Sequence, residues 1–260
     1  MTDKDLIFEF NQKILSIYEK ENLIPLSGEK DSYELPNGKQ ILVWYFEVTR
    51  HCLCHYNNNH FDYNKNIDDL LFTSDEIVYF LAHLYLYKPY MNNPIKDSFY
   101  RGQNMVYPMF LNLEGKRYDM YLGVVFEKIY NFWDRIGDLI ASYFPTKYTG
   151  NVYFSKTIKD LKADYDGNAD YDWLLEFVEN EFTDFNKERI NIVHYVSKNT
   201  EQKWEQLDQV ADYEKTKAFI DKRASYPDYF YELNEKTKVG FEKTISLLEE
   251  INKREKYKCN

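Results

Sequence analysis

Residues 118–144 read YDMYLGVVFEKIYNFWDRIGDLIASYF and carry the clearest helical pattern of the chain. Apolar side chains recur in it at alternating steps of three and four residues: Tyr118, Leu122, Val125, Ile129, Phe132, Ile136, Ile140 and Tyr143. That spacing places all of them along one face of an α-helix. The helix would be ~40 Å long at ~1.5 Å per residue, which is typical of a helical bundle. Pro145 marks its expected end.

The remainder of the second half also has helical patterns. Helices are expected over residues 153–163, 170–184, 200–222 and 226–254, with a further helix that carries Arg189 and His194. Asp170 is the expected N-terminal cap of the helix over 170–184, and a weak break is expected from Thr183 to Asn186. Ser225 is the expected cap of the last helix, which would hold Pro227 in its first turn.

The first half is less regular. A helix over residues 3–21 is indicated by apolar residues at helical spacing: Ile7, Phe10, Ile14 and Ile17. A second helix is expected over residues 74–87, with Thr73 or Ser74 as its cap, because acidic residues follow at once.

Short β-hairpins are expected in the same half. Asn37-Gly38 lies between two apolar runs and predicts a hairpin over residues 33–43. Residues 104–117 predict a second short hairpin around residues 113–115. Residues 43–55 are compatible with either a strand or a helix.

The fold class follows from these patterns. We expect a mainly α protein, in which residues 116–260 form an antiparallel helical bundle. Residues 1–115 form an N-terminal extension of helix, short β-hairpin and helix, whose role the sequence does not indicate. The chain has only 9 Gly and 7 Pro, which argues against a turn-rich β-sandwich.

Charge limits the function classes. The formal net charge is −10 and the pI is about 5.1, which argues against a non-specific DNA or RNA binder, because such proteins depend on Lys and Arg. A local basic site remains compatible with this balance. Residues 1–10 lack the basic and apolar regions of a signal peptide, and no stretch is long and apolar enough for a membrane span. The expected location is cytoplasmic, without a membrane partner.

One segment contains side chains of the types that bind metals. His51, Cys52, Cys54, His55 and nearby His60 are of these types, but no regular structure presents them together. We therefore favour reduced structural cysteines and surface histidines over a metal site. Glycine-rich phosphate loops and nucleophile-elbow motifs are absent as well, so no cofactor is expected.

Residues 188–195, ERINIVHY, hold the strongest chemical signal. Arg189 is a permanent cation suited to phosphate, and His194 has a side chain that exchanges protons near neutral pH. Five residues of helix correspond to about 140° of rotation, so these two side chains do not share one line. Asn191 and His194 are closer, at a three-residue step. A surface arginine beside a half-buried histidine at a bundle seam is the alternative interpretation.

The string of Arg189, Asn191, His194 and Tyr195 resembles the signature of the HEPN superfamily (higher eukaryotes and prokaryotes nucleotide-binding). That signature is an Arg, then four to six residues, then His, on a helix of an all-α bundle. Residues 131–140, NFWDRIGDLI, are similar to an early bundle helix of these proteins. The resemblance covers about residues 118–254.

The resemblance implies metal-independent RNA cleavage, often in defence or toxin systems. His194 would act as general base or acid, and Arg189 would stabilise charge on phosphorus. Asn191 would orient His194 or hold a phosphate oxygen, and Tyr195 would contact the substrate. The partners implied are RNA or a nucleotide and a second copy of the chain, since family members commonly pair, and no DNA is expected.

A polar stripe on the helix over 118–144 adds further candidates. Glu127, Asn131, Asp134 and Asp138 recur at steps of four, three and four, so they share a face. By the resemblance, Asp134 would orient Arg189 or His194, and Arg135 and Asp138 would contact the substrate. An ordinary solvated face is the simpler interpretation of the stripe.

The leading hypothesis is therefore a HEPN-type endoribonuclease. The alternatives are a catalytically inactive HEPN-like module for dimerisation, nucleotide binding or protein interaction, and a scaffold with an aromatic binding surface.

Overall fold

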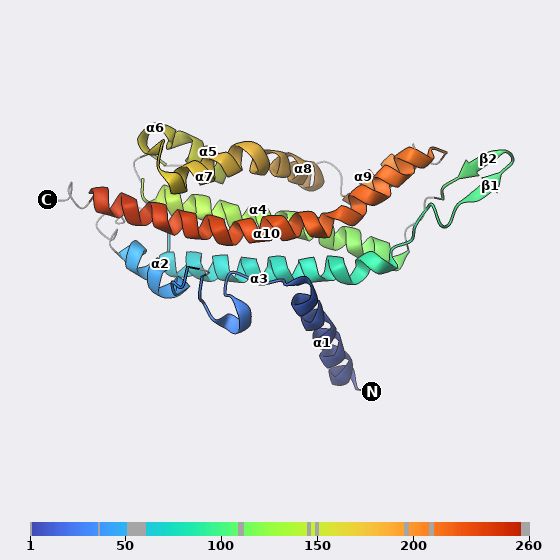
Figure 1. Cartoon of the computed structure of the whole chain (residues 1–260), viewed down its shortest axis with the longest axis horizontal. Coiled ribbons are helices and arrows are strands. Elements are labelled where there is room, and N and C mark those ends of the chain that lie inside the picture. Colours follow the sequence, from blue (N-terminus) through green and yellow to red (C-terminus); the bar gives the residue numbers. More distant parts are fainter. Residues whose placement is uncertain are drawn as a thin grey trace. The chain divides into compact units, whose positions relative to one another are not determined.

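The computed structural model describes residues 2–35, 37–50, 61–108, 112–144, 147–148, 151–194, 198–207 and 211–255. The elements follow in the order α1 (Asp3–Glu21), η1 (Glu29–Asp31), α2 (Ile41–Arg50), α3 (Tyr63–Tyr87), η3 (Lys88–Tyr90), β1 (Phe99–Arg101), β2 (Asn104–Val106), α4 (Leu113–Ser142), α5 (Phe154–Asp160), α6 (Lys162–Tyr165), α7 (Ala169–Phe177), η4 (Val178–Phe182), α8 (Thr183–His194), α9 (Lys198–Leu207) and α10 (Tyr213–Glu255) (Figure 1). Within the described ranges, the antiparallel pair β1–β2 is the one sheet. The prediction of a mainly α fold with a short hairpin is confirmed.

The chain forms two compact units. Unit 1 consists of residues 1–23, 78–127 and 188–233, and unit 2 of residues 24–77, 128–187 and 234–260. The long helices α3, α4 and α10 each contribute one part to unit 1 and the other part to unit 2. The domain boundary expected between residues 115 and 116 stays a prediction.

Helix α4 confirms the pattern of residues 118–144. The apolar residues that predicted it are all buried: Tyr118, Leu122, Val125, Ile129, Phe132, Ile136, Ile140 and Tyr143. The helix begins earlier than predicted, because the Asn112 side chain accepts a hydrogen bond from the Gly115 N–H at 2.8 Å. The hairpin predicted around residues 113–115 is therefore wrong, since these residues form the first turn of α4. The predicted end at Pro145 lies outside the described residues.

Helix α10 runs through the start predicted for the last helix. Ser225 and Pro227 lie in its interior, and no new helix begins there. A proline lacks the N–H that would bond to the carbonyl four residues earlier, here that of Arg223. In unit 1 the Tyr118 hydroxyl donates to this Arg223 carbonyl at 2.7 Å, in a buried position. Burial also raises the pKa of Tyr118, which keeps the hydroxyl protonated as a donor.

We expect the Tyr118→Phe variant to lose about 1–3 kcal/mol of stability, because the buried Arg223 carbonyl would lose its donor. In a Pro227→Ala background the restored N–H can donate to that carbonyl, so the same change should cost at least ~1 kcal/mol less. Urea denaturation of the four proteins of this cycle measures the difference. An equal cost in both backgrounds would show that the hydroxyl does not replace the missing N–H.

The first half differs from expectation in two helices. Helix α3 begins at Tyr63, so Thr73 and Ser74 lie inside it and are buried. The Ser74 hydroxyl accepts from the Leu26 N–H at 2.7 Å, so it caps a loop of unit 2 and not its own helix. Residues 41–50 form α2, which resolves the ambiguous segment as a helix up to Arg50.

The hairpins also lie elsewhere. The one predicted over residues 33–43 is reduced to a single bridge between Glu34 and Gln40, because α2 replaces its second strand. The hairpin that forms is β1–β2, with Gly102 in its turn at a φ of 66°. That positive φ favours glycine.

In unit 2, α5 and α7 lie beside the C-terminal part of α10 (Figure 1). Asn168, and not Asp170, caps α7, accepting from the N–H groups of Asp170 and Tyr171. Asp170 instead binds Lys243 and Ser246 of α10, at 2.9 and 2.6 Å. The predicted break after α7 is absent, because the π-helical segment η4 joins it to α8. Predicted helices over 153–163 and 200–222 correspond to α5 with α6, and to α9 with the start of α10.

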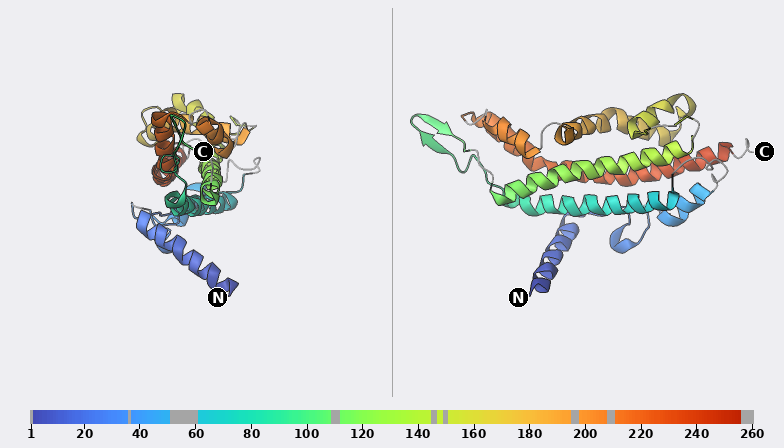
Figure 2. Two further views of the ribbon diagram at one scale, coloured as in Figure 1. Left: turned by 90° about the vertical axis from the view of Figure 1, so that its right-hand side faces the viewer. Right: turned by 180° about the vertical axis from the view of Figure 1, so that it is seen from behind.

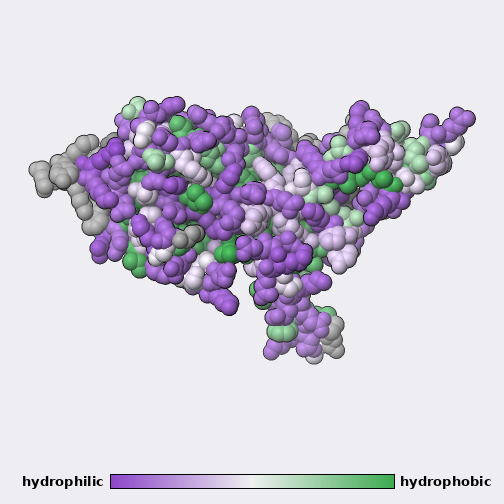
Figure 3. All heavy atoms as spheres, viewed as in Figure 1, coloured by the Kyte–Doolittle hydropathy of each residue, from purple (hydrophilic) through white to green (hydrophobic). Residues whose placement is uncertain are grey.

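Helix α1 confirms the prediction over residues 3–21, with Thr2 and Asp5 forming a capping box. Its N-terminal end points away from the other helices of unit 1 (Figure 2). The visible face of the chain is mainly hydrophilic with small scattered apolar areas (Figure 3), as 29% charged residues would suggest.

Candidate functional site

Arg189 lies on α8 and forms an ion pair with Glu127 of α4, both in unit 1. The Arg189 guanidinium nitrogen is 3.3 Å from the Glu127 carboxylate, and the Arg189 side chain is only 14% exposed. An ion pair held partly away from water is screened less than a surface pair. Glu127 therefore fixes the direction of the guanidinium.

Two further contacts hold α8 within unit 1. The Tyr226 hydroxyl of α10 donates to the Glu188 carboxylate at 2.5 Å. Gly123 of α4 lies next to Ile192 of α8, and a Cβ at this glycine would make an ordinary contact with the isoleucine Cγ2, at 3.8 Å. The backbone next to Arg189 is thus anchored on both sides.

Of the other motif residues, Asn191 is described in full, whereas His194 and Tyr195 are described only in part or not at all. Asn191 is exposed, and two residues of helix correspond to about 200° of rotation from Arg189. His194 is the last residue of α8, but its side chain lies outside the described part of the structure, as does all of Tyr195. The structure therefore shows the arginine of the predicted pair and the helix end that carries the histidine.

Asp134, Arg135 and Asp138 belong to unit 2, whereas Arg189, Asn191 and His194 belong to unit 1. The Arg135 Nε is 3.3 Å from an Asp69 carboxylate oxygen of α3. The carboxylate 3.3 Å from the Arg189 guanidinium is that of Glu127, which belongs to the predicted polar stripe. Sequence reasoning placed Glu127 in the stripe without giving it this role.

The Asp138 carboxyl group of the stripe has a raised pKa. The surrounding protein desolvates its carboxylate, and the Asp134 carboxylate repels it, so its pKa is raised to about 6 although Arg135 opposes the shift. The side chain still contacts solvent. A carboxyl group with such a pKa can exchange protons close to neutral pH.

This pKa predicts a pH-dependent stability. Between the ordinary value of 3.8 and about 6 the unfolded chain ionises Asp138 first, so stability is lost as pH rises through this window. Asp138→Asn removes that loss, and we expect its melting temperature to exceed the parent's by about 2 °C at pH 7.5 and to match it at pH 3.5. Asp97→Asn, at another exposed position, is the control and should show no such trend. A constant difference between Asp138→Asn and the parent across pH would contradict the shift.

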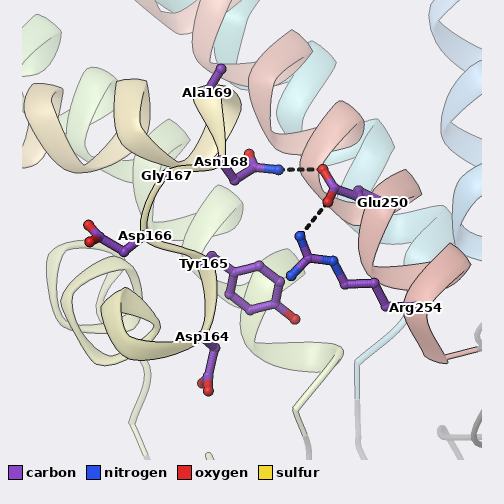
Figure 4. A pocket seen from close by; sticks show the side chains of 8 residues that line it. All are labelled: Asp164, Tyr165, Asp166, Gly167, Asn168, Ala169, Glu250 and Arg254. Carbon is purple, nitrogen blue, oxygen red and sulfur yellow. Dashed lines mark hydrogen bonds and ion pairs between the residues drawn. The ribbon is translucent and has the colours of Figure 1, made fainter.

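Unit 2 has a polar pocket of about 340 Å³ between the α6–α7 loop and the end of α10 (Figure 4). The Arg254 guanidinium donates to Glu250 at 2.5 Å and lies 5.4 Å from the Tyr165 ring centroid. Asn168 also donates to Glu250. Asp164 and Asp166 add two more carboxylates, so the lining opposes a phosphate group and this pocket does not suit RNA.

Within the described ranges, no group of three or more His, Cys, Asp or Glu side chains is arranged to hold a metal ion. His51, Cys52, Cys54, His55 and His60 lie outside these ranges, so the alternative of a metal site there stays open. None of the described helices is long and apolar enough to cross a membrane.

Comparisons with protein families, curated proteins and solved structures found no match to the chain.

Proposed function

We propose that this chain is a metal-independent endoribonuclease of the HEPN type, acting in a defence or toxin system, with Arg189 and His194 as its reacting groups. The observation that carries the proposal is the Arg189–Glu127 ion pair, which directs a guanidinium on the same helix that ends at His194. A directed cation and a histidine supply charge stabilisation and proton transfer, the two contributions that phosphodiester cleavage without a metal needs from side chains.

In the proposed reaction, His194 removes the proton of a ribose 2′-hydroxyl. The 2′-oxygen attacks phosphorus, the bond to the 5′-oxygen breaks, and that oxygen takes a proton from an acid. Arg189 stabilises the extra negative charge on the phosphorus oxygens in the transition state. Asn191 holds His194 or a phosphate oxygen, and a second copy of the chain supplies a second Arg and His.

Because the 2′-oxygen is the nucleophile, cleavage should stop wherever that oxygen is missing. We expect an RNA with a single 2′-deoxynucleotide to be cut at all the usual positions except after that nucleotide. The products should carry a 2′,3′-cyclic phosphate and a 5′-hydroxyl, which mass spectrometry of the fragments measures. Cleavage after the deoxynucleotide, or 5′-phosphate products, would exclude this mechanism.

A catalytically inactive interaction module is the second candidate, and the 14% exposure of the Arg189 side chain favours it. In that case the arginine serves only to hold α8 on α4. The module would leave RNA intact under all conditions, so the same assay separates the two candidates.

A further inference from the structure

The β1–β2 hairpin of unit 1 extends away from the helices of that unit (Figures 1 and 2). Its strands pair Phe99 with Val106, Tyr100 with Met105 and Arg101 with Asn104. Since side chains alternate across a strand, Tyr100 and Met105 share one face, and Phe99, Arg101, Asn104 and Val106 share the other. Each face thus carries an aromatic ring.

These rings are open to solvent. Tyr100 is 71% exposed and Phe99 50% exposed, and neither stacks on another ring among the described residues. The hairpin is attached to the unit through Tyr107, which is buried and whose ring centroid lies 6.0 Å from that of Tyr213. The hairpin therefore presents two aromatic faces from a fixed base.

The charge of the hairpin and the residues that follow it differs from that of the whole chain. The sequence has 43 acidic residues, yet residues 98–113 contain none and include Arg101. Arg101 is exposed and forms no ion pair with any other described residue. Acidic residues border this stretch at Asp97 and Glu114, but the hairpin itself offers a polyanion one positive charge and no negative charge.

We propose that the β1–β2 hairpin binds single-stranded RNA, with bases stacking on Tyr100 and Phe99 and Arg101 contacting a phosphate. The choice of RNA as partner rests on the proposed function. Aromatic side chains interleaved with a cation are the usual means of binding unpaired nucleotides without sequence preference. The exposed amides of Gln103 and Asn104 at the turn add hydrogen-bonding groups for base edges.

Pairing with a second copy of the chain through a strand edge is the competing use of such a hairpin. Each strand has only three residues, so an added strand would gain few backbone hydrogen bonds. Single-stranded RNA satisfies both the rings and the cation.

The test measures binding of a fluorescein-labelled 20-nucleotide oligouridylate by anisotropy, in a His194→Ala background that prevents cleavage. Tyr100→Ala should weaken binding about 5- to 100-fold, and Tyr100→Phe should bind like the parent because it keeps the ring. Arg101→Gln should reduce the slope of log affinity against log salt by about 1. Phe72→Ala, at a 64% exposed aromatic of unit 2, is the matched control and should have no effect.

The inference is overturned if the parent protein does not bind the oligouridylate, or if the parent and Tyr100→Ala proteins bind it with equal affinity. A change of oligomeric state in Tyr100→Ala, measured by sedimentation, would assign the hairpin to a second copy and overturn it as well. Cleavage by the protein with His194 intact is scored separately. Hairpin-dependent binding without cleavage would refute only the nuclease, and cleavage without hairpin dependence would refute only the hairpin site.

Discussion

The Gly240→Ala variant is expected to lose about 2 kcal/mol or more of stability. A Cβ at Gly240 of α10 would lie 2.2 Å from the Trp133 Cη2 and 2.6 Å from its Cζ3, in the core of unit 2. Trp133 is fully buried, with its ring centroid 4.8 Å from that of Phe154 and 4.4 Å from that of Phe177. The indole is packed against these rings, so the added methyl group overpacks the core, and this outweighs the higher helix propensity of alanine.

Gly123→Ala is the matched control, because it makes the same change inside a helix. The nearest atom to its added Cβ is the Ile192 Cγ2 at 3.8 Å, an ordinary contact. Alanine should therefore stabilise this position by about 0.5–1 kcal/mol. Urea denaturation should give opposite signs for the two substitutions.

A second variant makes the interpretation specific. Trp133→Phe removes the ring atoms that the new methyl group would meet, so it should cost less in the Gly240→Ala background than in the parent. Stability of Gly240→Ala equal to that of the parent would show that α4 and α10 do not approach as closely in unit 2 as these distances indicate.

Arg189→Gln is expected to reduce RNA cleavage about 100- to 1000-fold. Removing one group that stabilises developing charge typically has an effect of this size. Lys187→Gln also removes one positive charge from α8, but Lys187 is 70% exposed and its ion pair is with Asp184 in the same helix. We expect its activity to stay within about twofold of the parent.

Stability is measured alongside activity, because Arg189→Gln leaves the Glu127 carboxylate without its cation. A fully folded Arg189→Gln protein without activity supports a role in the transition state. Equal activity of the Arg189→Gln and Lys187→Gln proteins would exclude that role.

The regular part of the fold was predictable from local pattern. Residues 118–144 combine a long stretch with strict helical spacing, and every predicted core position of α4 is buried. Contacts between residues distant in sequence determine the features that the local sequence pattern did not predict. Pro227 is typical of a helix start, but inside α10 the hydroxyl of Tyr118, distant in sequence, donates to the Arg223 carbonyl that the proline leaves without its helical donor. Ser74 is typical of a cap, but it caps a loop 48 residues away.

The candidate site was predictable only in its chemistry. The Arg189 and His194 pattern and the polar stripe follow from sequence, and the stripe contains the carboxylate that the guanidinium meets. Which member of the stripe meets Arg189, 62 residues away, depends on how α8 rests on α4. The Tyr226–Glu188 hydrogen bond supports that placement, and it is not a recognisable local motif.

RNA cleavage in the presence of EDTA distinguishes metal-independent cleavage by His194 from cleavage that needs a metal. The purified parent protein should cut a single-stranded RNA with the chelator present, and the His194→Ala protein, matched in fold by circular dichroism, should leave the same RNA intact. Cleavage that requires a divalent metal, or equal cleavage by the His194→Ala protein, would contradict the account.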